Sequence, residues 1–293
     1  MPFLICSARL STMPVMFENF LYSYWKNGKP IYAPNPFGEK LGIDIKRQVN
    51  KAYKFDSFIY HFKDGSHVVA LHKHRANNFF CRIDIARFFY NVQRNRLKRV
   101  LKDIGIFRAE YYAKWSTVKN PFAGGGYVIP YGFVQSPILA TLVLARSAIG
   151  DYLRGLDPTI TVSVYMDDIC LSGNDEAALQ VAFDGLLAAA HVAGFELNDD
   201  KTRPPAPQID IFNCTLENGK TEVLPERIDK FYAEFRTGAG EASFETYCDI
   251  VKSHTWRIGA RKRRRRLHFM SKRKAALVAA TAPVVPPPAP EAT

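Results

Sequence analysis

The sequence predicts an α+β fold, with an antiparallel sheet backed by helices. Two strand-like apolar runs, 161–164 and 169–173, flank a polar four-residue centre, which is typical of a short hairpin. Apolar residues at helical spacing follow over 176–193, and another strand-like run follows at 209–216. Strand–helix–strand segments of this kind are typical of an antiparallel sheet that is covered by helices.

The first eighty residues are predicted to form a leading helix, a loop and a hairpin. Four apolar residues within 1–30 recur at helical spacing: Phe17, Phe20, Leu21 and Tyr24. Three prolines and two asparagines make 30–38 a predicted loop. Asp64-Gly65 lies between the strand-like runs 58–62 and 67–71, and this pattern predicts a β-hairpin.

The remaining elements alternate between strands and helices. A strand is expected to end at Asp84, and the basic run 94–102 predicts a helix with an apolar inner face. A further helix is expected over 138–149. A proline-rich turn (202–207), a basic helical segment (226–275) and a disordered Ala/Pro tail (276–293) complete the chain.

Three aspartates are the candidate metal ligands. Asp167 and Asp168 are adjacent at the tip of the predicted hairpin, and Asp84 lies at a strand end. Neighbouring buried anions need a compensating cation, and Mg²⁺ binds through one or two carboxylates plus substrate phosphates. Taken alone, Asp84 could cap the following helix, and the Asp-Asp pair could be a solvated turn. The combination is more specific than either part.

These segments resemble motifs of the reverse transcriptases. Asp84-x-x-x-Phe88-Phe89 resembles motif A, and Tyr165-Met166-Asp167-Asp168 resembles motif C. Three further segments follow the family's order, as motifs B, D and E: 130–137, 194–202 and 211–216. The segment from Lys63 to Arg75 lies where the fingers belong. Two residues depart from the pattern: Tyr131 stands where motif B usually has Gln, and Arg87 stands where motif A is often acidic or small.

The resemblance implies a right-hand polymerase with fingers, palm and a short helical thumb. It places the N-terminal helix and fingers in 1–80, the palm with interleaved fingers segments in 81–225, and the thumb in 226–275. It implies an enzyme that copies an RNA template into DNA from dNTPs, using two Mg²⁺ ions, with Mn²⁺ as an alternative.

The resemblance also assigns roles to the residues near the acids. Asp84 and Asp167 would bridge both ions, Asp168 would assist, and the backbone carbonyl of Ile85 would add an oxygen ligand. Lys201, at the end of motif D, would be a general acid for the pyrophosphate; a surface ion pair with Asp200 is the alternative.

Other positions are expected to contact the nucleotide or the nucleic acid. Phe89 would be the steric gate that excludes a 2′-hydroxyl, while core packing is the alternative for its ring. The remaining nucleotide contacts would come from Tyr131, Gly132, Lys63, Lys73 and Arg75. For the three basic residues, exposed charge is the alternative. The nucleic-acid contacts would come from Ser136, Pro137, Tyr165 and Met166.

Charge points to a polyanionic partner. Forty basic and twenty-eight acidic residues give a net charge of +12 over 293 residues. The densest basic run has no acidic residue, and its arginines are expected to bind the nucleic-acid backbone: Arg261, Arg263, Arg264, Arg265 and Arg266. A disordered solubilising tail is the alternative for this run.

The five cysteines have no metal-ligand spacing, which favours a reducing, cytoplasmic location. Neither a signal peptide nor a membrane span is expected.

The subtype is inferred by elimination. We expect no maturase, endonuclease or RNase H extension and find no retron signature, and the sequence is similar to bacterial antiphage defence enzymes, which typically use a structured non-coding RNA. A retron or other bacterial reverse transcriptase, an RNA-dependent RNA polymerase and a non-catalytic RNA-binding scaffold are the alternatives.

Overall fold

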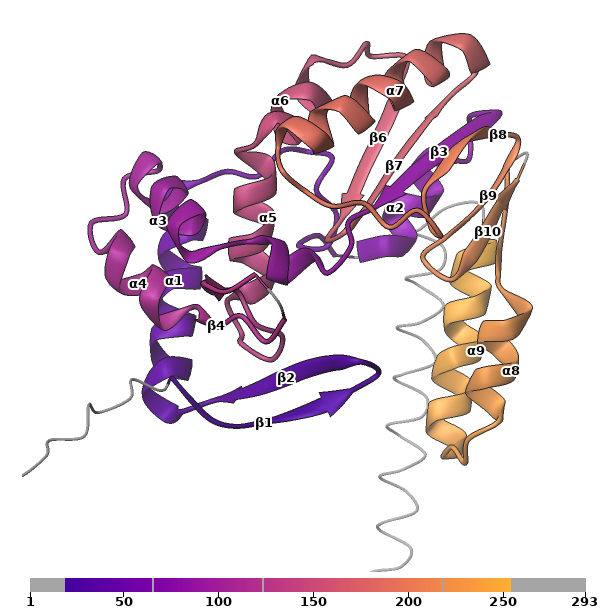
Figure 1. Cartoon of the computed structure of the whole chain (residues 1–293). Coiled ribbons are helices and arrows are strands. Elements are labelled where there is room, and N and C mark those ends of the chain that lie inside the picture. Colours follow the sequence, from indigo (N-terminus) through magenta and orange to yellow (C-terminus); the bar gives the residue numbers. More distant parts are fainter. Residues whose placement is uncertain (1–18, 65, 123, 218, 254–293) are drawn as a thin grey trace, which may run out of the picture. The chain divides into compact units, whose positions relative to one another are not determined.

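The computed structural model describes residues 19–253 except residues 65, 123 and 218. The chain divides into two compact units. Unit 1 contains residues 1–54 and 87–143, and unit 2 contains residues 55–86 and 144–293. Both units combine helices with antiparallel strands (Figure 1), which confirms the predicted α+β class. Within the described residues, no helix is long and apolar enough to span a membrane.

Unit 1 consists of two small antiparallel ribbons and several helices. The first ribbon pairs β1 (Phe20–Lys26) with β2 (Lys29–Pro34), and the second pairs β4 (Val118–Lys119) with β5 (Tyr127–Val128). The helical elements are α1 (Pro36–Ala52), the 3₁₀ turn η1 (Phe88–Asn91), α3 (Arg94–Asp103), α4 (Ala109–Trp115) and most of α5 (Ser136–Ala145). The predicted inner face of α3 is confirmed, because Leu97, Val100 and Leu101 are buried.

The predicted leading helix is wrong for the described part of 1–30. The chain instead forms the β1–β2 hairpin, whose turn is Asn27-Gly28 with φ of 50° and 70°. Asn-Gly is the dipeptide that favours such a turn, since both central residues need positive φ. The loop predicted at 30–38 is also wrong, because it contains β2 and the start of α1, which Asn35 caps by accepting from the Gly38 N–H at 2.7 Å.

Unit 2 is built on a four-stranded antiparallel sheet in the order β6-β7-β3-β8. These strands are β6 (Thr161–Tyr165), β7 (Asp168–Gly173), β3 (Phe79–Asp84) and β8 (Arg203–Ala206). Helix α7 (Glu176–Val192) packs along β3, β7 and β8 (Figure 1), as the helical spacing of 176–193 predicts. The motif C hairpin and the strand that ends at Asp84 are confirmed.

A smaller three-stranded sheet and further helices complete unit 2. The sheet has the order β11-β10-β9, formed by β9 (Gln208–Ile211), β10 (Cys214–Glu217) and β11 (Lys220–Val223). The helices are α2 (Ser66–His74), α6 (Ala148–Gly155), α8 (Pro225–Tyr232) and α9 (Gly238–Lys252). Helices α8 and α9 confirm the helical character predicted for the described part of 226–275, while the assignment of this segment as a thumb stays a prediction. Residues from 254 onward, including the predicted tail, lie outside the described residues.

Three further local predictions in unit 2 are wrong. The segment 67–71 belongs to helix α2 and not to a hairpin, because its buried residues Val68, Leu71 and His74 recur every three residues and pack as one helical face. The predicted strand 209–216 is two strands, joined at Phe212 and Asn213 with φ of 56° and 60°. The turn predicted at 202–207 contains β8.

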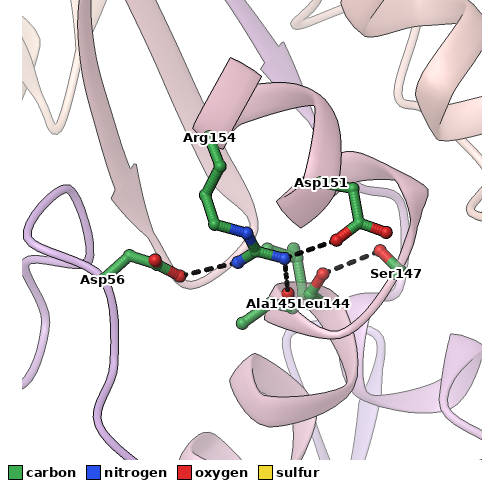
Figure 2. Close-up of polar contacts among 6 residues, drawn as sticks. All are labelled: Asp56, Leu144, Ala145, Ser147, Asp151 and Arg154. Atoms are coloured by element: carbon green, nitrogen blue, oxygen red, sulfur yellow. Dashed lines mark hydrogen bonds and ion pairs between the residues drawn. The ribbon is translucent and has the colours of Figure 1, made fainter. Parts of the chain in front are cut away.

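The helix predicted over 138–149 is interrupted after Ala145. Arg154 donates to the Ala145 carbonyl at 2.9 Å and pairs with Asp151 and Asp56 at 2.6 and 2.9 Å (Figure 2). Ser147 donates to the Leu144 carbonyl at 2.7 Å. A guanidinium on the last carbonyls of a helix satisfies acceptors that the helix leaves open and favours its negative end. The ending of α5 is therefore stabilised by Ser147 and Arg154, and the guanidinium of Arg154 is held in turn by the sequence-distant Asp56.

A buried histidine joins α2 to the central sheet. The ring nitrogens of His74 lie 2.7 Å from the hydroxyls of Ser172 and Ser163, and Asn77 donates to Ser172 at 2.6 Å. Burial lowers the pKa of His74 to about 3, below its ordinary value of 6.5. The ring is therefore neutral at pH 7.

This histidine predicts acid sensitivity. The unfolded chain binds a proton at His74 below pH 6.5 whereas the folded chain does not, so stability is lost as the pH falls from 6.5 toward 3. We expect the free energy of unfolding to drop by on the order of 2 kcal/mol from this group between pH 7 and pH 4. Chemical denaturation across this range should show a flatter profile for His74→Gln. The exposed His191→Gln should retain the wild-type profile.

Candidate active site

Three carboxylates lie at one end of the central sheet of unit 2. Asp84, the last residue of β3, is the direct cross-strand partner of Asp168, the first residue of β7. The N–H of Ile85 donates to the carbonyl oxygen of Asp167 at 3.0 Å. The antiparallel register therefore brings together acids that are more than eighty positions apart in the sequence, as motifs A and C predict.

A tight turn holds Asp167 between its strands. Tyr165 pairs with Asp168 across the turn, which leaves Met166 and Asp167 as the two-residue loop. Met166 has a φ of 57°, a left-handed conformation that is unfavourable for a residue with a side chain. Its N–H donates to Nδ1 of His61 at 3.3 Å. Burial lowers the pKa of His61 to about 4, so the neutral ring is available as the acceptor at pH 7.

The motif D segment is tied to the same strand end. The carbonyl of Asp84 accepts from the Asn198 N–H at 2.8 Å, and the Ala86 N–H donates to the Glu196 carbonyl at 2.9 Å. Nζ of Lys201 lies 3.1 Å from Oδ2 of Asp84. The ammonium of Lys201 is therefore paired with Asp84, a predicted metal ligand. The alternative given by the sequence was a surface ion pair with Asp200.

The surroundings of Asp168 raise its proton affinity. The pKa of Asp168 is raised from 3.8 to about 7 by burial, which has the largest effect, and by the negative charges of Asp167 and Asp84; Arg82 and Lys201 act in the opposite direction. Asp84 is only 3% exposed. The end of the sheet is thus a partly buried anionic site whose positive neighbours compensate it incompletely.

This donor set fits hard divalent cations. Within the described residues, no three His, Cys, Asp or Glu side chains are arranged so that they could hold a metal ion by themselves. Mg²⁺ does not need such a group, because it keeps several waters and takes one or two carboxylates together with substrate phosphates. Ile85, whose carbonyl is the predicted backbone ligand, is buried and directly follows Asp84, and its role as a ligand stays a prediction.

Tyr165 and Met166, the predicted nucleic-acid contacts of motif C, lie beside this site. The ring of Tyr165 lies 5.5 Å from that of Phe212 and 5.8 Å from that of His67. It therefore packs on the turn of the β9–β10 hairpin, where motif E was predicted. Both Tyr165 and Met166 are half-buried.

The predicted gate and motif B residues belong to unit 1. Phe89 is 7% exposed, and its ring lies 4.6 Å from that of Tyr131. Gly132 has a φ of 103°, and a Cβ at this position would collide with the Tyr32 carbonyl, so this residue must be glycine. Ser136 donates to the Pro130 carbonyl at 2.6 Å and is buried, whereas Pro137 is half-buried.

The three basic residues of the predicted fingers hairpin lie in and around α2. Lys63 donates to the Ser57 carbonyl, and its Nζ lies 4.1 Å from the centre of the Tyr60 ring. Lys73 is exposed. Arg75 donates to the carbonyl of Gly219 at 2.7 Å and to that of Ser253. These contacts of Arg75 hold α2 against the ends of β10–β11 and α9, and its contact with a nucleotide stays a prediction. The run from Arg261 to Arg266 lies outside the described residues.

Two residues of the site were not foreseen from the sequence. Arg82 donates through Nε to the Lys201 carbonyl at 2.8 Å and lowers the pKa of Asp168. It lies two positions before Asp84 on the same strand, and period-two alternation places both on one face, which was a usable signal. His61 lies within an aromatic run and offered no comparable signal.

The chain is similar in sequence to one protein family and, at low identity, to solved structures. The family model described as "Reverse transcriptase (RNA-dependent DNA polymerase)" matches residues 39–212. A solved structure of the foamy viral protease-reverse transcriptase with double-stranded DNA is 17% identical, with a TM-score of 0.44, and the match covers 74% of this chain and 32% of that chain. A structure of telomerase from Candida albicans with a telomeric RNA fragment is 12% identical, with a TM-score of 0.47 and coverage of 65% and 38%.

This chain thus spans 32% and 38% of the length of these two solved chains. The family match covers more than half of its 293 residues. The chain belongs to the reverse transcriptase family.

Proposed function

We propose that this protein is an RNA-directed DNA polymerase that adds dNTPs to a primer by two-metal catalysis. The observation that carries the proposal is the cross-strand pairing of Asp84 with Asp168 beside Asp167, in a site where their mutual repulsion helps to raise the pKa of Asp168 to about 7. A partly buried carboxylate that is repelled by two others is costly to keep in a fold unless the group binds cations.

Mg²⁺ would be held by Asp84, Asp167, Asp168 and the Ile85 carbonyl. When bound, two such ions lower the pKa of the primer 3′-hydroxyl and stabilise charge on the leaving pyrophosphate. Lys201 is the proton donor to the pyrophosphate in this proposal. Its side chain is 53% exposed, whereas that of Asp84 is only 5% exposed. In this proposal Mg²⁺ compensates the buried Asp84 carboxylate when the ammonium of Lys201 turns to a substrate phosphate. Arg82 positions this lysine through its backbone carbonyl.

Phe89 is proposed as the steric gate against ribonucleotides. Because its ring also packs on that of Tyr131, the gate role has to be distinguished from core packing. Phe89→Val should increase ribonucleotide incorporation relative to deoxyribonucleotide incorporation, on the order of tenfold or more, because the excluding ring is removed. The measurement is the ratio of kcat/KM for a matched rNTP and dNTP. Phe88→Leu, at the buried neighbouring ring, is the control that should leave the ratio unchanged. An unchanged ratio in Phe89→Val would assign its ring to core packing alone.

The partners we propose are an RNA template, DNA product and dNTPs. The sequence resemblance supports a structured non-coding RNA as template and a role in bacterial antiphage defence. The cysteine usage supports a cytoplasmic location. The arginines from Arg261 to Arg266 are proposed to bind the nucleic-acid backbone in this setting.

Primer extension tests this function against its alternatives. On a primed RNA template with Mg²⁺, wild-type protein should incorporate dNTPs in preference to rNTPs. Preference for rNTPs would indicate an RNA-dependent RNA polymerase. RNA binding without any metal-dependent extension would indicate a non-catalytic scaffold.

A further inference from the structure

The charges of the described chain are strongly segregated between the two units. The described residues of unit 1 contain sixteen Lys and Arg against four Asp and Glu, a net charge of +12. Those of unit 2 contain thirteen basic and twenty-two acidic residues, a net charge of −9. The attraction for a polyanion in the described chain therefore comes from unit 1.

Part of this charge surrounds a cleft between α3 and α4. The open cleft has a volume of about 690 Å³ and is lined by Lys102, Phe107, Arg108, Ala109, Glu110, Tyr111 and Lys114. Glu110 is the one acid among these seven lining residues, and it is paired with Lys98 of α3 at 3.3 Å. The cleft is therefore positively charged. Its volume is in the range that accepts a nucleotide-sized group.

An aromatic ring projects at the same place. Phe107 is 96% exposed, whereas its neighbour Ile106 is 6% exposed and anchors the loop in the core. The backbone N–H groups of Gly105 and Ile106 donate to the carbonyls of Lys102 and Leu101, each at 2.9 Å. The loop is therefore tied to the end of α3. An ordered loop that exposes a whole phenyl ring beside three cations offers a stacking platform next to phosphate-binding groups.

We propose that the α3–α4 cleft docks single-stranded RNA, with the backbone on Lys102, Arg108 and Lys114 and an unpaired base on Phe107. Unpaired bases of loops and ends stack on aromatic side chains, while paired bases do not present their faces. The choice of RNA over DNA rests on the proposed function, since the template of such an enzyme is RNA. The cleft is an addition to the site at the acids, because it would position RNA and has no group for the chemistry.

Binding of a labelled RNA tests the stacking part of the proposal. The probe is a fluorescein-labelled oligo(A) RNA of about 12 nucleotides, within the footprint of single-strand binding modules. Anisotropy is measured with the full chain in EDTA and without dNTPs. Phe107→Ala should weaken binding about 5- to 100-fold, the loss expected for one stacked base, and Phe107→Trp should retain it. Phe235→Ala is the matched control, because Phe235 is also 96% exposed but lies in the acidic unit.

The charged part has its own readout. Replacing Lys102, Arg108 and Lys114 together by Gln should make the log–log dependence of affinity on salt shallower by about 2, at about 0.7 per phosphate contact. Phe107→Ala should leave this slope unchanged. The control is the corresponding triple substitution of Lys220, Arg227 and Lys230 in unit 2, which should keep the wild-type slope.

Three results would overturn the proposal. The first is an equal loss of RNA affinity in Phe107→Ala and Phe235→Ala. The second is an unchanged salt slope in the triple variant of the cleft. The third is that this variant loses binding to phosphatidylserine vesicles but keeps RNA binding, which would assign the cleft to a lipid surface. Failure of the proposed function would instead show as absence of extension by the wild type. The binding assay does not depend on that activity.

Discussion

Asp84→Asn is expected to lower the rate of primer extension at saturating dNTP by about a thousandfold or more, roughly 4 kcal/mol in activation free energy. The substitution keeps the shape of a side chain that is 3% exposed but removes the charge that it would share with Mg²⁺. It also removes the ion pair with Lys201. Since Asp84 repels Asp168, loss of that repulsion offsets the lost pair, and the free energy of unfolding should change by less than about 1–2 kcal/mol.

The control for this variant is a strand aspartate outside the site. Asp210 of β9 is exposed and accepts from Thr215 at 2.8 Å. Asp210→Asn should retain extension, and both variants should bind RNA as the wild type does. Substantial Mg²⁺-dependent extension by Asp84→Asn would mean that the metal ligands are misassigned.

Asp168→Asn is expected to stabilise the metal-free protein at pH 8. The pKa of Asp168 is raised from 3.8 to about 7, so the folded chain binds more protons than the unfolded chain between these values. Stability therefore falls as the pH rises through this window. Removing the carboxylate should raise the free energy of unfolding at pH 8 by on the order of 1–3 kcal/mol, and by much less at pH 4.5.

Thermal unfolding with EDTA or with Mg²⁺ checks this prediction. Mg²⁺ should stabilise the wild type, because a ligand that binds the folded state shifts the equilibrium, and should stabilise Asp168→Asn less. Asp184→Asn on the exposed face of α7 is the control with no expected gain at either pH. If Asp168→Asn were less stable than the wild type at pH 8, the carboxylate would be favourably paired and the electrostatic account of the site would be wrong.

The catalytic end of the sheet could be predicted because its signals are local and sharp. Apolar runs around Asp167 and Asp168 specify a hairpin, and the strand before Asp84 has the same character. Their convergence needs only antiparallel pairing of β3 with β7. Local patterns could not show that β3 and β7 are neighbours. The order of the reverse transcriptase motifs along the chain indicated it.

The failures have physical causes. The Asp-Gly turn at 64–65 favoured a hairpin, but the face formed by Val68, Leu71 and His74 packs as a helix, so tertiary burial overrode the local turn signal. The Asn27-Gly28 turn was a stronger local signal than the helical spacing around it. Contacts such as Lys201 with Asp84, or Arg154 with the end of α5, join segments that no local pattern relates.

Charge was informative only after the fold was known. A net charge of +12 for the whole sequence suggested a polyanionic partner. Among the described residues, unit 1 carries a net charge of +12 and unit 2 a net charge of −9. The basic unit includes Phe107 and its cleft, which no motif indicated.

Single-turnover extension of a labelled primer on an RNA template, with dNTPs and Mg²⁺, tests the central claim most directly when the wild type is compared with Asp167→Ala. We expect the wild type to add deoxynucleotides, addition to cease in EDTA, and Asp167→Ala to bind the same primer–template but add none. Extension by Asp167→Ala at a rate near that of the wild type, or none by folded, RNA-bound wild type in Mg²⁺ or Mn²⁺, would contradict the account.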